Sequence, residues 1–379
     1  MENKIYLSSP HMGGTEEAYV KEAFDTNWIA PLGPNVNGFE DAIKTYQKEE
    51  VEVAALSSGT SAIHLALIQC GVEAGDEVIC QSFTFCGSIN PIMYLGARPV
   101  LVDSERTTWN ICPIHLEEAI KDRIANGNKP KAIIAVHLYG MPYQVEAVHR
   151  VAMTYDIPII EDSAEALGSS YKNQKCGTFG KFGILSFNGN KIITTSGGGA
   201  LVCNSLEEKE KTLFLATQAR DDAPHYEHTT IGFNYRLSNI CAGIGRGQME
   251  VLDKHIALRR KMNAFYASIF KDIQGVSLLQ ESSEDYFSNH WLSAILIDKD
   301  KTGGIGREDL RLAFAEENIE ARPLWKPMHL QPIFKGEKYY GSGVAETLFE
   351  SGLCLPSGSN LTDTDRDRIE KVIFATFKV

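Results

Sequence analysis

The sequence lacks the features that mark membrane-spanning, secreted or nucleic-acid-binding chains. No segment approaches the roughly 18 uninterrupted apolar residues of a membrane-spanning helix. The N-terminal stretch MENKIYLSSPHMGG has no apolar core of the kind found in signal peptides. Acidic residues outnumber basic ones, and the net charge of −12 disfavours a nucleic-acid surface, which needs a basic stripe. We therefore expect a cytoplasmic protein that binds neither membranes nor nucleic acid.

Motifs for metal, disulfide and nucleotide binding are also missing. The eight cysteines are scattered and none forms a C-x-x-C pair, so the sequence indicates no metal site and no disulfide framework. No G-x-x-x-x-G-K-[ST] loop occurs, and GIGRGQ (243–248) lacks both the G-x-G-x-x-G spacing and a preceding strand. A kinase or a dehydrogenase is therefore disfavoured. We expect 243–248 to lie in a helix whose small residues permit close packing.

What the chain does contain, from about residue 50 to 205, is a series of short apolar runs separated by longer helical stretches. Runs that are apolar on both faces and alternate with helices are typical of a buried, mostly parallel sheet with helices on both sides. The sequence thus predicts a doubly wound α/β domain with a seven-stranded sheet. The expected strands are VAAL (53–56), EVIC (77–80), PVLVD (99–103), KAIIAVHLYG (131–140), IPIIED (157–162), GILSF (183–187) and ALVC (200–203).

The pattern changes after residue 240. Residues 241–272 have a helical period and predict a long helix that leads to a second unit. That unit would contain a strand at 289–297 and a final amphipathic helix near 362–377. We predict a large domain over 1–250, which includes the N-terminal segment, and a smaller C-terminal α+β domain over 251–379.

Polar residues follow three of the predicted strands. In LSSGTSAIHLALI (56–68) a strand ends and a helix opens, which suits phosphate because helix N-termini present free N–H groups. An N-cap formed by Ser58 or Thr60 is the alternative. Asp162, in IIEDSAEALGS, stands at the carboxyl edge where α/β sheets bind ligands, and an N-cap is again the alternative. Lys191 follows GILSF at the same edge, with a solvated loop cation as its alternative.

An anion cradle, a carboxylate and a lysine at one sheet edge match the needs of pyridoxal phosphate. The phosphate would take the helix start, and Asp162 would stabilise the protonated ring nitrogen. Lys191 would form the Schiff base with the cofactor. The combination points to pyridoxal phosphate more strongly than any single site does.

The sequence resembles the DegT-type, pyridoxal phosphate-dependent nucleotide-sugar aminotransferases, which have the aspartate aminotransferase (type I) fold. The resemblance covers nearly the whole chain. It is strongest to the UDP-4-keto-6-deoxy-N-acetylglucosamine aminotransferases of the bacillosamine pathway, through SPHMGG, NGNKIITTSGGG, HYEH, NYRLSN and RPLWK. The family motifs occur in order as NWIAPLGPNVNGFE, SSGTSAIHLAL, QSFTF, EDSAEALGS, SFNGNKIITTSGGG, GFNYRLSN and RPLWKPMH.

The resemblance implies roles for the residues around the cofactor. Lys191 would carry the cofactor and move a proton, and Asp162 would pair with the pyridine nitrogen. The phosphate would be held by the amides of Thr60 and Ser61 together with Ser186.

Other residues would define the substrate and the assembly. Phe85 would stack on the cofactor ring, with an ordinary core aromatic as the alternative. Asn234 would reach the phosphate from the neighbouring subunit of a homodimer with a shared active site. Glu165 would lie near cofactor and substrate, where Glu or His suggests amination at C4 of the sugar rather than C3. Trp325 and His329 would lie near the nucleotide-sugar, and packing of the smaller lobe is the alternative for both.

The implied reaction moves an amino group from L-glutamate to C4 of a UDP-linked 4-keto-6-deoxy-N-acetylhexosamine. Ser196, Gly197 and Gly198 replace the Gly-Glu-Gly of many relatives, a variant of the bacillosamine branch. Another branch has His in place of the lysine and dehydrates its substrate, and Lys191 argues against that chemistry. The alternatives are a dTDP- or GDP-linked 4-keto or 3-keto sugar as substrate, and a regulatory protein that keeps the fold and senses a ligand.

Overall fold

The computed structural model describes residues 3–48 and 50–378. Its largest element is an eight-stranded sheet in the order β1-β9-β8-β5-β4-β2-β3-β14. Only the pairings of β9, with β1 and β8, are antiparallel, which confirms the mostly parallel α/β fold. The seven predicted strands are present as β1 (Glu52–Leu56), β2 (Glu77–Gln81), β3 (Arg98–Val102), β4 (Ala132–Val136), β5 (Ile159–Asp162), β8 (Phe182–Ser186) and β9 (Gly199–Cys203).

The eighth strand of the large sheet was not predicted. β14 (Lys338–Tyr340) pairs in parallel with β3 at the edge of the sheet, with Lys338 opposite Val100. It comes from the part of the chain that the sequence assigns to the second domain. The strand has three residues and no apolar run, so strand patterning gives no signal for it.

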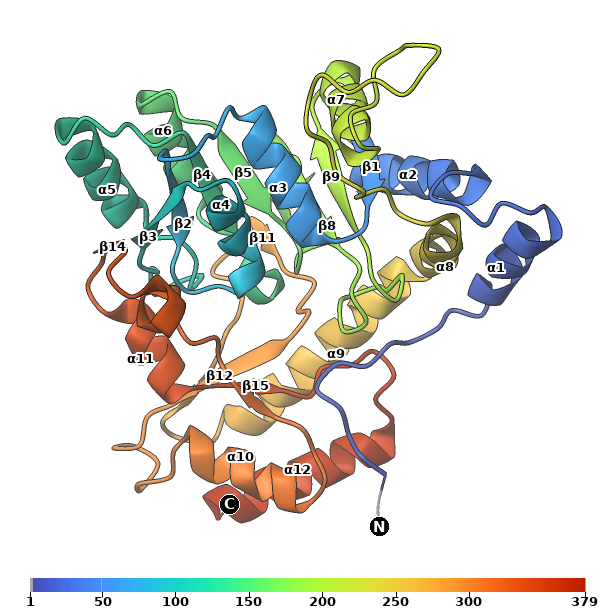
Figure 1. Ribbon diagram of the computed structural model, residues 1–379. Coiled ribbons are helices and arrows are strands. Elements are labelled where there is room, and N and C mark those ends of the chain that lie inside the picture. The colour runs from blue at the N-terminus through green and yellow to red at the C-terminus, as the bar shows by residue number, and fades with distance from the viewer. Residues whose placement is uncertain (1–2, 49, 379) are drawn as a thin grey trace.

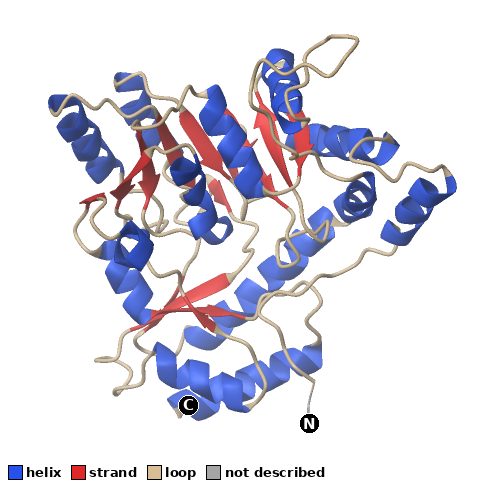
Figure 2. Ribbon diagram, viewed as in Figure 1, coloured by secondary structure: helices blue, strands red, loops and turns tan. Residues whose placement is uncertain are grey.

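Helices cover both faces of the large sheet, because its central strands are buried on both sides. In β2, Val78 and Cys80 pack in the core under α3 (Gly59–Gln69) and α4 (Asn90–Tyr94). Ile79, between them, points to the opposite face and packs with α5 (Pro113–Ala125) and α6 (Val145–Thr154). Figures 1 and 2 show α3 and α4 on the near face of the sheet.

The N-terminal helices cover the sheet near β1. α2 (Pro34–Gln47) packs against β1, and α1 (Glu16–Asp25) and α2 both contact α8 (Asn239–Glu250). A Cβ on Gly245 of α8 would lie 2.7 Å from the ring of Phe39 in α2. Helices α8 and α2 therefore approach closely only because position 245 is glycine. The prediction that GIGRGQ lies in a closely packed helix is confirmed. α7 (Leu206–Ala216) covers β1 and β9, and the loop after it projects at the upper right of Figure 1.

A smaller antiparallel sheet follows in the C-terminal part, in the order β10-β12-β15-β13. The helix predicted over 241–272 is two helices, α8 and α9 (Leu252–Phe270), which meet at Val251. The predicted strand 289–297 begins later, at Ser293, and the final helix matches its prediction. These elements are β10 (Val276–Leu278), β12 (Ser293–Ile297), β13 (Arg322–Pro323), β15 (Gly352–Leu355), α10 (Arg307–Glu316), α11 (Val344–Ser351) and α12 (Asp363–Phe377).

The smaller sheet has its own apolar core, formed with α9, α10 and α12. The domain division between residues 250 and 251 stays a prediction. A third sheet of short strands, in the order β11-β6-β7, joins the two parts: β6 (Ser170–Tyr171), β7 (Gln174–Lys175) and β11 (Tyr286–Phe287). Short 3₁₀ turns occur at η1 (Cys86–Ser88), η2 (Leu138–Gly140), η3 (Met328–Leu330) and η4 (Pro332–Phe334).

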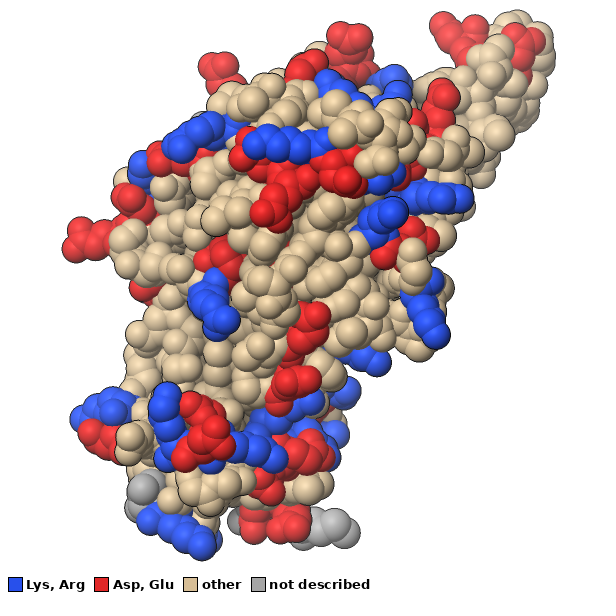
Figure 3. All heavy atoms as spheres, turned by 90° about the vertical axis from the view of Figure 1, so that its left-hand side faces the viewer, with Lys and Arg blue, Asp and Glu red and all other residues tan. Residues whose placement is uncertain are grey.

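The surface carries charges of both signs. Figure 3 shows lysine and arginine side chains interspersed with aspartate and glutamate over one face, rather than gathered into one basic stripe. Within residues 3–48 and 50–378, no helix is long and apolar enough to cross a membrane.

Candidate active site

A cavity of about 340 Å³ opens at the edge of the large sheet where β1, β5 and β8 end. This is the edge at which open α/β sheets bind ligands, because the loops after the strands diverge there. Seven of the predicted site residues line the cavity: Thr60, Phe85, Asp162, Glu165, Ser186, Lys191 and Trp325. The fold therefore brings together residues that are up to 265 positions apart in the sequence.

The first turn of α3 forms one wall of the cavity. Ser58 caps the helix, since its Oγ accepts a hydrogen bond from the amide of Ser61 at 3.0 Å. The amides of Gly59 and Thr60 belong to the first helical turn, where N–H groups have no partner within the helix. A Cβ on Gly59 would lie 3.2 Å from that of Ser186, so glycine here keeps the helix start close to β8. The geometry suits an oxyanion bound at the helix start.

The sequence predicts that the amide of Ser61 helps to hold the phosphate, but Ser61 does not line this wall of the cavity. It is buried outside the cavity lining, and its amide is already bonded to Ser58 because the two residues form a capping box. The N-cap alternative is correct for Ser58 and not for Thr60, which lines the cavity together with Ser186.

Asp162 ends β5 and is 4% exposed. Its Oδ2 accepts a hydrogen bond from Ser88 Oγ at 2.6 Å, and its Oδ1 accepts one from the amide of Ala164 at 3.1 Å. These two donors hold the carboxylate at the cavity wall. Ser88 was missed by the sequence reasoning, because it lies three residues beyond Phe85, outside the QSFTF motif.

Lys191 lies in the loop between β8 and β9, with its side chain mostly buried. Its Nζ is 3.4 Å from Glu165 Oε1 and 4.1 Å from the centre of the Trp291 ring. Trp291 also lines the cavity and was not predicted, since it stands at the start of a predicted strand where an apolar residue is expected. The lysine is therefore held between a carboxylate and an aromatic face rather than solvated.

Glu165 is buried, and its second oxygen, Oε2, accepts a hydrogen bond from the amide of Tyr139 at 2.7 Å. Burial raises the pKa of Glu165 above its ordinary value, against the opposing effects of Lys191 and of the Tyr139 amide. The pair gives the cavity one amine and one carboxyl group able to exchange a proton.

Two aromatic side chains form the outer wall of the cavity. Phe85 is 51% exposed, and its ring centre lies 5.4 Å from that of Trp325. Trp325 stacks on Tyr139 with ring centres 6.2 Å apart, and its backbone amide donates to the Tyr139 hydroxyl. A half-exposed Phe85 is not a core aromatic, so its apolar ring remains available to a ligand.

Besides Ser61, two predicted residues lie outside the cavity lining, His329 and Asn234. Both ring nitrogens of His329 are occupied, Nδ1 by Ser82 Oγ at 2.7 Å and Nε2 by Glu346 Oε1 at 2.9 Å. These bonds favour the packing alternative for His329, which fixes the segment after Trp325 to the sheet. Asn234 is exposed and lies outside the cavity of its own chain.

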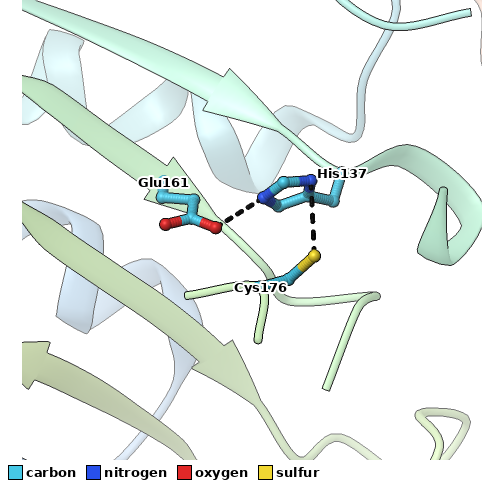
Figure 4. Close-up of side chains that lie close together, drawn as sticks. All are labelled: His137, Glu161 and Cys176. Atoms are coloured by element: carbon cyan, nitrogen blue, oxygen red, sulfur yellow. Dashed lines mark hydrogen bonds and ion pairs between the residues drawn. The ribbon is translucent and has the colours of Figure 1, made fainter. Parts of the chain in front are cut away.

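A second cluster of buried polar side chains lies apart from the cavity and includes Glu161, the neighbour of Asp162 in the sequence. The Nε2 of His137 bonds Glu161 Oε1 at 2.6 Å, and Cys176 Sγ is 3.8 Å from the Nδ1 of His137 (Figure 4). These three residue types are metal-ligand types, and their ligand atoms lie within 4.8 Å of one another. The Nδ1 of His137 also accepts from the amide of Tyr143, and amides of the 177–180 turn donate to Glu161. Hydrogen bonds therefore account for this cluster without an ion.

Comparison with known proteins places the cavity in context. A model of the DegT/DnrJ/EryC1/StrS aminotransferase family matches residues 10–374. The chain belongs to this family. It is 50% identical over 384 residues to EpsN of Bacillus subtilis (strain 168), whose name classes it with the pyridoxal phosphate-dependent aminotransferases, and the match covers all of this chain and 97% of EpsN.

Other relatives agree with this assignment. The chain is 38% identical over 360 residues to GDP-perosamine synthase of Escherichia coli O157:H7, covering 95% of this chain and 94% of the relative. The solved structure of the aminotransferase TlmJ from Streptoalloteichus hindustanus matches with a TM-score of 0.90 at 27% identity, covering all of this chain and 99% of TlmJ. The protein is thus a pyridoxal phosphate-dependent sugar aminotransferase with the predicted type I fold.

The residues around the cavity fit this cofactor chemically. A helix start and hydroxyl groups suit the phosphate, a buried carboxylate suits a protonated ring nitrogen, and an amine suits the aldehyde. One cavity is lined by all three kinds of group: Thr60 at the helix start, the carboxylate of Asp162 and the amine of Lys191.

Proposed function

We propose that this aminotransferase moves the amino group of L-glutamate to C4 of a UDP-linked 4-keto-6-deoxy-N-acetylhexosamine. The observation that carries the proposal is the contact between Lys191 Nζ and Glu165 Oε1, 3.4 Å apart inside the cavity. By the resemblance to the family, a glutamate at this position suggests amination at C4 of the sugar rather than at C3. The product would be a UDP-4-amino-4,6-dideoxy sugar of the bacillosamine type, used in a surface glycan or glycoprotein.

The cofactor-binding roles that we propose follow from the geometry of the wall residues. Pyridoxal phosphate supplies an electron sink in its protonated ring and a carbonyl carbon that carries the amino group. Asp162, held by Ser88 and Ala164, would accept the hydrogen bond of the ring nitrogen. Thr60 and Ser186 would bind the phosphate with the free amides of the α3 start, and Phe85 would cover the ring.

Lys191 would attach the cofactor and carry the transferred proton. Its Nζ lies beside Glu165, so the carboxyl group is placed to accept or return a proton when the amine is released. Burial raises the pKa of Glu165, so its carboxylate is a stronger proton acceptor than an exposed one. We propose that Glu165 also faces the C4 substituent, and that Trp325 contacts the nucleotide-sugar.

We propose that a homodimer completes the site. Asn234 stands exposed outside its own cavity, as expected for a residue that serves a neighbouring subunit. An exposed apolar residue three positions before Asn234 supports an interface, since Ile231 is 84% exposed.

The rival within the same class is a GDP- or dTDP-linked keto sugar. The 38% identity to a GDP-perosamine synthase favours this candidate. The two proposals differ only in the nucleotide-sugar, so one half-reaction decides between them.

The deciding experiment starts from the protein converted with L-glutamate to its pyridoxamine form and then freed of the donor. UDP-4-keto-6-deoxy-N-acetylglucosamine is added, and a parallel sample receives a GDP-linked 4-keto-6-deoxyhexose. We expect the visible absorbance of the Lys191-bound cofactor to return with the UDP-sugar. Recovery with the GDP-sugar alone would discard the proposed substrate and keep the aminotransferase. Identifying the product amine by NMR would assign C4 or C3.

A further inference from the structure

Arg259, in the middle of α9, is a buried cation without a buried anion. It is 1% exposed, and no carboxylate among residues 3–48 and 50–378 forms an ion pair with it. Burial lowers the pKa of Arg259 to about 9, which shows how strongly the surroundings disfavour its charge. A guanidinium in such a place is stabilised only through the hydrogen bonds that it donates.

Those hydrogen bonds converge on the segment that carries Lys191. The Nη1 of Arg259 donates to the carbonyl of Trp291 at 2.6 Å and to that of Ser357 at 3.3 Å. Its Nη2 donates to Ser8 Oγ at 2.9 Å and lies 3.5 Å from the carbonyl oxygen of Lys191. One planar group thus links α9 to the N-terminal segment, to the segments just before β12 and just after β15, and to the Lys191 loop.

The neighbouring peptide is held from two sides by the partners of Arg259. Ser8 Oγ and the indole Nε1 of Trp291 each donate to the carbonyl of Asn190 at 2.6 Å. Trp291 also places its ring 4.1 Å from Lys191 Nζ. The carbonyl of Asn190 is therefore held by two hydrogen-bond partners of Arg259, and the carbonyl of Lys191 is contacted by Arg259 itself.

We propose that Arg259 is a positioning residue for Lys191, which it fixes by clamping the backbone of residues 190–191 together with Ser8 and Trp291. Arg259 itself is absent from the cavity lining, so it touches neither substrate nor cofactor. This inference rests on the proposed role of Lys191 as the attachment point of pyridoxal phosphate. A displacement of about 1 Å at a reacting atom can cost about 10²-fold in rate, so a clamp on the peptide of a reactive lysine has a measurable effect.

The test measures how fast Lys191 bonds to the cofactor, independently of turnover. The full-length protein is stripped of cofactor, pyridoxal phosphate is added, and the rise of visible absorbance gives the rate. Borohydride reduction followed by peptide mapping confirms the modified lysine. The visible circular dichroism of the bound cofactor reports how it is held, and thermal unfolding of the cofactor-free protein reports stability.

Three variants probe the clamp. We expect Arg259→Met to slow bond formation by about 10²-fold and to weaken the visible circular dichroism. Arg259→Lys keeps the charge but loses the two-pronged geometry, so we expect a partial rescue, about 10-fold slower than the wild type. Ser8→Ala removes one link of the clamp from a half-buried position, and we expect a loss of about 3-fold.

Arg260→Met is the matched control, because Arg260 is the adjacent arginine of α9 and bonds Glu281 and the carbonyl of Ser288 instead. It should lose stability but bond the cofactor within about 2-fold of the wild-type rate.

The proposal is overturned if Ser8→Ala and the folded Arg259 variants all bond the cofactor at the wild-type rate. An equal loss in Arg260→Met overturns it as well, because the effect would then follow from a weaker α9. If both Arg259 variants fail to fold, the Ser8→Ala rate decides alone. A wild-type protein in which Lys191 is not the reduced residue refutes the proposed function instead, which peptide mapping separates from a failure of the clamp.

Discussion

Glu161 and Asp162 are adjacent carboxylates on β5, and their side chains lie on opposite faces of the large sheet because strand residues alternate. Both are at least 95% buried. The oxygens of Glu161 accept four N–H hydrogen bonds, from His137, Gly177, Phe179 and Gly180. Those of Asp162 accept two, from Ser88 and Ala164.

The difference in hydrogen bonding separates a structural carboxylate from an available one. An ionised carboxylate offers about four acceptor sites, and the protein fills those of Glu161. Burial alone would raise the pKa of Glu161, but the bond and charge of His137, with the turn amides, outweigh it and lower the pKa. Asp162 keeps acceptor capacity toward the cavity. Composition and burial do not distinguish the two residues, whereas their partners do.

Among the cavity residues, Lys191→Ala is expected to have the largest effect on kcat. Removing the amine eliminates both the attachment point and the proton carrier, so we expect kcat to fall by at least about 10⁴-fold. The protein should still bind pyridoxal phosphate and unfold within about 1 kcal/mol of the wild type. Single-turnover kinetics and thermal unfolding check both statements. Retained activity would refute the proposed mechanism.

Asp162→Asn sharpens the comparison with its neighbour. The amide cannot stabilise a protonated ring nitrogen as a charged carboxylate does, so we expect kcat to fall by about 10²- to 10³-fold. Stability should change little, because Asp162 has few protein partners to lose. Steady-state kinetics at saturating cofactor measure the loss. A large loss of stability with a normal kcat would mean that Asp162, like Glu161, has a structural role.

Glu161→Gln should show the opposite behaviour. The uncharged amide of glutamine loses the charge-assisted hydrogen bonds of the carboxylate, and its NH₂ group cannot accept from the turn amides. Hydrogen bonds to charged groups contribute about 1.5–3 kcal/mol each, so unfolding should require less denaturant at pH 7, while the folded enzyme keeps its kcat. Because folding lowers the pKa of Glu161 below its ordinary 4.5, its stabilisation is fully present above that value and is lost as the pH falls through the folded-state pKa. The gap between variant and wild type should therefore shrink below about pH 4. A gap that is independent of pH would contradict this account.

Phe85→Leu should give the smallest effect. A stacked aromatic contact contributes about 0.5–1.5 kcal/mol, so we expect the dissociation constant of pyridoxal phosphate to rise by about 3- to 10-fold. Since the side chain is half exposed, stability should not change measurably. Cofactor titration followed by absorbance measures the shift, and an unchanged constant would mean that Phe85 does not cover the ring.

Much of the fold could be read from apolar runs. The central strands are buried on both faces, so each of the seven appears in the sequence as an uninterrupted apolar segment. The helix break at Val251 gave no signal, because no glycine or proline marks it. β14 was missed because a three-residue edge strand has no pattern of its own.

The cavity residues were predicted best where a motif ends a strand, as at Asp162 and Lys191. Features that depend on tertiary geometry were not visible. The bond from the Ser61 amide to Ser58 and the two partners of His329 arise from side-chain positions, which strand and helix patterns do not specify. Arg259 was overlooked because a single arginine in an amphipathic helix is normally solvated.

The pairing of β14 with β3 has a consequence for synthesis of the chain. An unpaired edge strand is a template for association with other chains. β3 pairs with β2 on one side, and on its other side it obtains a partner only from residues 338–340. During translation the sheet is therefore complete on that side only when nine-tenths of the polypeptide has emerged from the ribosome. A fragment that stops near residue 250 would present a bare apolar strand to its neighbours, and we expect it to aggregate where the full-length chain does not.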